Sequence, residues 1–100
     1  MEYQIRCKIF PGQFSGEFAV EGAQWNGENF SLFVPAKSVV IDEAPTRDRS
    51  ADGWLKARLW ELAGGRAVVQ LPRESFESGR FVTVDLSQFK VRPEPVEVQG

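Results

Sequence analysis

Apolar and polar residues alternate along most of this chain, which is the pattern of half-buried β-strands. The first alternating segment covers residues 3–9, places Cys7 on its inner face and is followed by a Pro-Gly pair. A second segment covers residues 14–22, and another covers residues 82–86. A short apolar run at residues 38–41 predicts one more strand. The sequence therefore predicts a protein built mainly from short strands.

The turn after the second alternating segment contains Asn26-Gly27, a pair that favours a two-residue hairpin loop. Such a loop would place charged residues on both faces of the hairpin. A three-residue loop that begins at Trp25 instead pairs Val20 with Leu32, which leaves one face apolar and the other mostly polar. Because a one-residue slip moves every side chain to the opposite face, the pattern predicts this longer loop. Its last residue, Gly27, is expected to be left-handed.

The segment GWLKARLWELAGG, residues 53–65, is compatible with either a helix or a strand. Its residues are good helix formers, and Asp52 is a suitable helix cap. In a helix, however, Lys56 would lie within the apolar arc, whereas a strand separates the apolar side chains from Lys56 and Arg58. We therefore expect a strand here, with a helix over residues 53–63 as the alternative.

Two phrases in the chain share a Pro-x-x-Ser pattern: FVPAKS, which begins at Phe33, and QLPRES, which begins at Gln70. Chemistry at the serines would need a neighbouring base, and none is evident. A structural joint is the better interpretation, because Pro ends a hydrogen-bonded ladder and a Ser hydroxyl satisfies a freed backbone group at a turn.

A shift of the chain by 37 residues aligns these phrases together with the segments around them. The match predicts two similar hairpins, at residues 17–34 and 54–71, and leaves open whether they arose by duplication. In this register the second hairpin pairs Leu59 with Ala67. Its three-residue loop ends at Gly64, in the place that Gly27 takes in the first hairpin.

The elements add up to six or seven short antiparallel strands, which is typical of a small all-β barrel or sandwich of SH3-like or OB-like size. One hundred residues suit a single domain. We expect a β domain over residues 1–90 and an extended or disordered tail over residues 91–100, with an edge strand around 96–98 as an alternative. The polar segment 42–53 is expected to be a surface loop, and Gly79 to be left-handed in a tight turn.

The stretch GRAVVQLPRESFESGRFVTV, residues 65–84, resembles the swapped-hairpin transcription factors of the AbrB type, in which a strand ends in Pro and a Gly precedes the next strand. The segment from Pro72 to Gly79 is too short for the helix of that family. The resemblance therefore carries no function to this chain.

Composition excludes several kinds of chemistry. The chain has no histidine, which removes the commonest general base and zinc ligand, and Cys7 is its one cysteine. A buried thiol is inert, and the acidic pairs fall in predicted loops and turns. No phosphate-binding, dinucleotide-binding or metal-binding motif occurs. We expect a protein that is not an enzyme, with no cofactor and no metal.

Charge and hydropathy narrow the expected partners. The net charge is −2 and the isoelectric point about 5.1, which argues against a dedicated nucleic-acid binder. The sequence has neither a signal peptide nor an apolar run long enough to span a membrane, so we expect a cytoplasmic protein without a membrane partner.

One face of the predicted second hairpin carries an unusual concentration of tryptophan and cationic side chains. The residues of this candidate binding face are Trp54, Lys56, Arg58, Trp60 and Arg66. Trp60 would lie opposite Arg66, which permits a cation–π contact. Trp and Arg are the residues that dominate protein interfaces. We therefore expect an interaction module that binds a protein partner or self-associates. A barrel that binds single-stranded nucleic acid through the same residues is the alternative, which the acidic isoelectric point disfavours.

Overall fold

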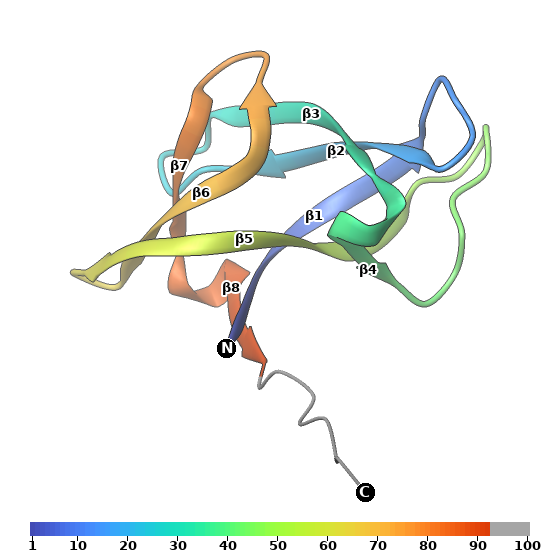
Figure 1. Ribbon diagram of the computed structural model, residues 1–100. Helices are drawn as coiled ribbons and strands as arrows, with labels where there is room; N and C mark the ends of the chain where they lie inside the picture. The colour runs from blue at the N-terminus through green and yellow to red at the C-terminus, as the bar shows by residue number, and fades with distance from the viewer. Residues whose placement is uncertain (93–100) are drawn as a thin grey trace, which may run out of the picture.

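The computed structural model describes residues 1–92 and shows an all-β protein (Figure 1). Its strands are β1 (Glu2–Pro11), β2 (Glu17–Ala23), β3 (Asn29–Pro35), β4 (Val39–Ile41), β5 (Ala51–Ala63), β6 (Arg66–Ser75), β7 (Gly79–Asp85) and β8 (Phe89–Arg92). Two short 3-10 helices, η1 (Ala36–Ser38) and η2 (Leu86–Gln88), precede β4 and β8. The predicted all-β class is confirmed. The alternative of a helix at 53–63 is wrong, because these residues lie in β5.

The strands form one antiparallel sheet in the order β3-β2-β1-β5-β6-β7, with β4 added beside β5 and β8 beside β1. The sheet curls into a half-barrel in which β3, near one end of this order, contacts β6 near the other (Figure 1). Apolar side chains of both ends meet inside the curl. The described residues include no helix long and apolar enough to cross a membrane.

The two halves of the chain repeat the same series of elements: three strands, a 3-10 helix and a short strand. The registers repeat as well. Leu55 pairs with both Ile5 and Val39, and Ile5 pairs in turn with Phe89, so that residues 5 and 39 correspond to 55 and 89. The ladder between β1 and β5 is therefore centred on an approximate twofold axis. Ile5 and Leu55 are equivalent residues that are paired with each other.

Turn contacts repeat as well, with an offset of 49 or 50 residues. The Ala36 N–H donates to the Gly16 carbonyl at 2.9 Å, and the Leu86 N–H donates to the Gly65 carbonyl at 3.1 Å. Both glycines have positive φ. The internal repeat is thus a shift of about 50 residues, seen in the ladders, the 3-10 helices and the turns alike, and the shift of 37 residues aligns segments that are not equivalent in the fold.

The first hairpin has the predicted register: Val20 pairs with Leu32, and the three-residue loop ends at Gly27 with φ +86°. The second hairpin differs from its prediction. Leu59 pairs with Val69 rather than Ala67, and the ladder shifts between Leu59 and Glu61. The loop is the two-residue Gly64-Gly65, at φ +60° and +76°. Two glycines suit a tight hairpin turn of this kind. A bulge at Trp60 leaves that residue unpaired and shifts the ladder by one residue.

The two Pro-x-x-Ser phrases have different structural roles. Pro35 ends β3, as predicted, whereas β6 continues through Pro72 to Ser75. The buried Ser75 hydroxyl donates to the Gly79 carbonyl at 2.7 Å and accepts from the Ser78 N–H at 3.0 Å. The joint interpretation holds for this second serine, which closes the turn between β6 and β7. Gly79 has the predicted left-handed conformation, with φ +67°.

Two boundaries differ from the sequence prediction. The segment 42–53 is not loop throughout, because β5 begins at Ala51. The final strand β8 was not expected, and it carries Val91 and Arg92 beside β1. Residues 93–100, which include the alternative edge strand at 96–98, lie outside the described residues.

Hairpin loops form hydrogen bonds to the outer edges of β3 and β7, at one residue of each strand. The Trp25 N–H, in the loop after β2, donates to the Thr83 carbonyl of β7 at 2.9 Å. The loop after β6 does the same for β3: the Phe76 N–H donates to the Ser31 carbonyl at 2.9 Å, and the Glu77 carboxylate accepts from the Ser31 N–H at 2.7 Å. This exchange satisfies edge groups that would otherwise pair with another chain.

Candidate functional site

Both central strands change their outer neighbour partway along. The outer edge of β1 pairs with β8 up to Ile5 and with β2 from Lys8 onward. The outer edge of β5 pairs with β4 up to Leu55 and with β6 from Arg58 onward. Each change leaves a short gap in the ladder, and a groove opens beside each gap. The two grooves are equivalent under the internal repeat.

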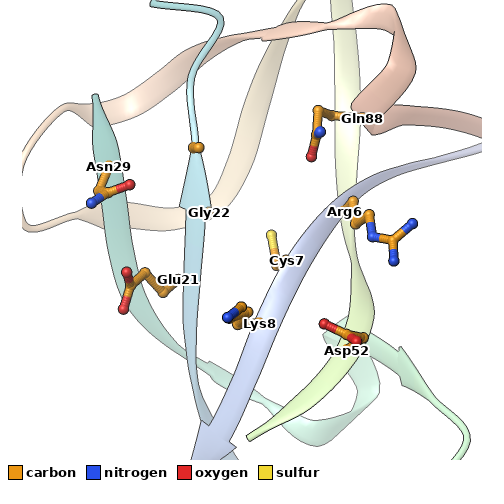
Figure 2. Close-up of a pocket in the computed structure, with 9 residues that line it drawn as sticks. Arg6, Cys7, Lys8, Glu21, Gly22, Asn29, Asp52 and Gln88 are labelled. Atoms are coloured by element: carbon orange, nitrogen blue, oxygen red, sulfur yellow. The ribbon is translucent and has the colours of Figure 1, made fainter. Parts of the chain in front are cut away.

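The groove between β1 and β2 has a volume of about 260 Å³. It is lined by Arg6, Cys7, Lys8, Glu21, Gly22, Ala23, Asn29, Asp52 and Gln88. The two cations of this groove are balanced by two acids. The charges lie on neighbouring strands, since Lys8 is in register with Glu21 of β2 on one side and with Asp52 of β5 on the other. Figure 2 shows Cys7 between the ribbons of β1 and β2, with Gln88 of η2 at one end of the groove. We call it the mixed groove.

Cys7 is the one nucleophilic thiol of the chain, and its environment makes it unreactive. The side chain is 4% exposed, in agreement with its predicted inward direction. Burial raises the pKa of the Cys7 thiol to about 12. The thiolate, which is the reactive form, is therefore nearly absent near neutral pH. The mixed groove offers no activated nucleophile from this residue.

We expect Cys7 in the native protein to react with an aromatic disulfide reagent about 10³-fold more slowly at pH 8 than in the urea-unfolded protein, because thiolate content scales with the pKa difference. A native rate equal to the unfolded rate would show that the thiol is not buried as described.

The same shift predicts a pH dependence of stability. Folding raises the Cys7 pKa, so the stability it contributes is complete below pH 9.0, its ordinary value, and is lost as pH rises toward about 12. Between these two pH values, urea unfolding should show that the free energy of unfolding falls more steeply with pH for the wild type than for Cys7→Ala. Equal falls in the two proteins would contradict the predicted pH dependence.

The groove between β5 and β6 has a volume of about 440 Å³ and a different charge. It is lined by Lys56, Ala57, Arg58, Gln70, Leu71, Pro72 and Arg80. Three of these residues are cationic and none is acidic. We call it the cationic groove.

The charge of the cationic groove follows from how each half fills its core. In the first half, Phe30 is fully buried and its ring lies against Gly22. Val69 pairs with Val82 in the second half as Val20 pairs with Leu32 in the first. Two residues further along β6 and two residues back along β7, the positions equivalent to Gly22 and Phe30 therefore hold Leu71 and Arg80. Leu71 is 1% exposed and supplies the apolar volume itself, so the side chain at position 80 is free to reach the rim of the groove. An apolar core position in one half has become a cationic surface position in the other.

Contacts hold two of the three cations in place. Arg80 donates from Nε to the Leu71 carbonyl at 3.2 Å and from Nη2 to the Pro72 carbonyl at 3.4 Å. The Lys56 ammonium lies 3.4 Å from the Glu2 carboxylate. A hydrogen bond from Gln4 and the charge of Lys56 lower the pKa of Glu2. Glu2 therefore stays ionised and keeps Lys56 beside the groove.

An exposed aromatic pair borders the cationic groove. The Trp60 and Phe81 rings meet edge to face, with centroids 5.3 Å apart, and are 67% and 45% exposed. Phe81 is in register with Gln70, which is in register with Arg58, so the pair lies beside the groove-lining residues. The bulge at Trp60 interrupts the alternation of β5 at this point.

The structure brings together part of the predicted binding face. Lys56 and Arg58 line the cationic groove, and Trp60 lies at its border. The predicted pairing of Trp60 with Arg66 is wrong, because the two-residue loop Gly64-Gly65 places Ala63 opposite Arg66.

The other two residues of the predicted face have partners elsewhere. Arg66 lies over the ring of Trp25, 3.5 Å from its centroid. Trp54 is half-buried, with the Lys90 ammonium 5.1 Å from its ring centroid.

Sequence reasoning missed Arg80 and Phe81. A signal for Phe81 was present, since a large aromatic residue stands on the polar side of the alternation of Val82 and Val84. Arg80 gave no such signal. Its position in the groove depends on the pairing of β6 with β7 and on the volume of Leu71.

Fold and grooves together define a small antiparallel half-barrel made of two equivalent halves, each with one groove. The chain matches no protein-family model, and it shows no significant similarity to a curated protein or to a solved structure. Within residues 1–92 no cluster of three or more potential metal ligands occurs.

Proposed function

We propose that this protein is a non-catalytic interaction module that binds a partner protein, or a second copy of itself, through the cationic groove and the Trp60–Phe81 pair. The observation that carries the proposal is the exposure of two touching aromatic rings beside Arg58. Exposed aromatic groups of this size are costly to leave in water, and Trp and Arg are the commonest energetic centres of protein interfaces. Loops already bond to the edges of β3 and β7 at Ser31 and Thr83, whereas the two aromatic rings are exposed.

Single-stranded nucleic acid is less well supported as the ligand. Proteins that bind it combine aromatic platforms with a groove that is basic along its length. Trp54, the second tryptophan of the predicted face, is half-buried under Lys90. The net charge of −2 also opposes a long polyanion.

We expect the double variant Trp60→Ala, Phe81→Ala to remain folded and to lose association. Association is measured as self-association in sedimentation velocity and as recovery of a partner by affinity purification. Loss of two interface aromatics typically weakens binding by about 2 kcal/mol or more, which is roughly thirtyfold.

The matched control is Phe14→Ala, which removes an aromatic side chain that is 73% exposed in the turn between β1 and β2. The proposal fails if the double variant associates as the wild type does, or if the Phe14 control loses association to the same extent.

A further inference from the structure

We propose that the occupant of the cationic groove is an extended acidic segment of the partner protein. Its carboxylates bind Lys56, Arg58 and Arg80, and an apolar side chain packs on the Trp60–Phe81 pair. This inference rests on the proposed function and specifies the chemistry of the partner.

Charge complementarity is the first argument. The cationic groove presents three positive side chains and no acidic one among its lining residues. The equivalent mixed groove is lined by the corresponding segments of the first half but also contains Glu21 and Asp52. At the position of Glu21 the second half has Gln70, which hydrogen-bonds without repelling an anion. At the position of Asp52 it has Glu2, whose carboxylate pairs with Lys56 at 3.4 Å. The cationic groove therefore has three cations with one acid beside it, whereas the mixed groove has two cations and two acids.

The geometry of Arg80 is the second argument. A guanidinium has five N–H donors, and the two bonds to the Leu71 and Pro72 carbonyls use two of them. The remaining donors are available to a carboxylate, and the carbonyl contacts fix the orientation of the group before binding. A pre-positioned guanidinium loses less side-chain freedom on binding, which favours a specific contact over a diffuse one.

The extent of the charged surface is the third argument, and it favours a peptide over a nucleic acid. The charge next to the groove in sequence is mixed rather than uniformly basic: exposed Glu61 follows Trp60, and exposed Arg73 and Glu74 follow Pro72. A polyanion that ran beyond the groove would meet these charges. A short peptide with a few carboxylates and an apolar residue would not. The volume of about 440 Å³ suits a ligand of that size.

The test uses three fluorescent probes of equal length on the whole chain: a glutamate-rich peptide containing one leucine, its lysine-for-glutamate counterpart, and oligo(dT). Binding is measured by anisotropy at low salt and located by backbone amide chemical shifts. We expect the glutamate peptide to bind, to shift amides of Lys56, Arg58 and Arg80, and to weaken as salt is added.

A matched pair of variants separates the groove from the overall charge. Arg58→Gln and Lys8→Gln remove one exposed cation each, at equivalent positions of the two grooves. We expect Arg58→Gln to weaken the glutamate peptide about tenfold and Lys8→Gln less than about twofold. Arg80→Gln should match Arg58→Gln, and thermal unfolding checks that each variant is folded.

Three outcomes would overturn the inference: equal binding of the glutamate and lysine peptides, equal effects of Arg58→Gln and Lys8→Gln, or tighter binding of oligo(dT) at the same amides. The last would assign the groove to nucleic acid. If the glutamate peptide does not bind while the Trp60→Ala, Phe81→Ala variant still loses its partner, the proposed function stands and the acidic partner is wrong.

Discussion

Replacement of Phe30 by Ala is expected to lower the free energy of unfolding by about 3–5 kcal/mol, the usual cost of truncating a buried aromatic residue. Phe30 is 0% exposed and lies directly across from Gly22 in the hairpin of β2 and β3. A side chain at position 22 would place its first carbon 2.4 Å from the Phe30 ring. Truncation at position 30 therefore leaves a cavity, because the residue opposite is Gly22, which has no side chain to fill it.

The second half shows how this cavity can be filled, since it has Leu71 where the first half has Gly22. We expect Gly22→Leu to destabilise the wild type by about 1–3 kcal/mol through overpacking, and to restore part of the stability of Phe30→Ala. The two substitutions should therefore show a favourable coupling energy in a double-mutant cycle measured by urea unfolding. Additive losses would mean that positions 22 and 30 do not share one space.

Replacement of Leu55 by Ala is expected to cost about 2–5 kcal/mol. Leu55 is 0% exposed and pairs with Ile5 on one side and Val39 on the other, in a row that continues to Phe89. Four strands meet at this row, so the cavity would lie where the two halves join. Because Ile5 is the equivalent residue, Ile5→Ala should cost a similar amount.

Leu62→Ala is the matched control for Leu55→Ala. It removes the same side chain from the same strand, at a position that is 54% exposed, and should change the unfolding free energy by less than about 0.5 kcal/mol. Losses of similar size at Leu55 and Leu62 would contradict the burial described here. A smaller slope of the unfolding free energy against urea concentration in Leu55→Ala would indicate that the two halves do not unfold as one unit in that variant.

Alternation of apolar and polar residues was sufficient to predict the strand class and the first hairpin. The register of that hairpin followed from side-chain parity, because charged residues could not face the core. The strand within residues 53–65 was predictable for the same reason, since Lys56 has no place in the apolar arc of a helix.

The second hairpin was mispredicted because two local features change its register. Gly64-Gly65 forms a shorter loop than the alignment with Gly27 implied, and the bulge at Trp60 shifts the ladder again, so that Leu59 pairs with Val69 rather than Ala67. A bulge leaves no clear mark in the alternation of a strand end that is mostly exposed. The resemblance of the two Pro-x-x-Ser phrases then supported a repeat of the wrong length.

The candidate site was only partly predictable. Lys56, Arg58 and Trp60 were found because they share one strand. Arg80 belongs to the same groove only through the ladder of β6 and β7 and through the replacement of Phe30 and Gly22 by Arg80 and Leu71. Arg80 can be recognised as a groove residue only when the repeat of about 50 residues is used to compare the two halves.

The internal repeat also makes the order of the two halves interchangeable. Arg92 is paired with Glu2, so a short linker there would join the halves in reverse order, while the segment 42–50 between β4 and β5 could be opened. The permuted chain would begin at β5 and end at β4, with the same succession of three strands, a 3-10 helix and a short strand. We therefore expect the permuted chain to keep the ladder between β1 and β5, which is the contact that joins the two halves.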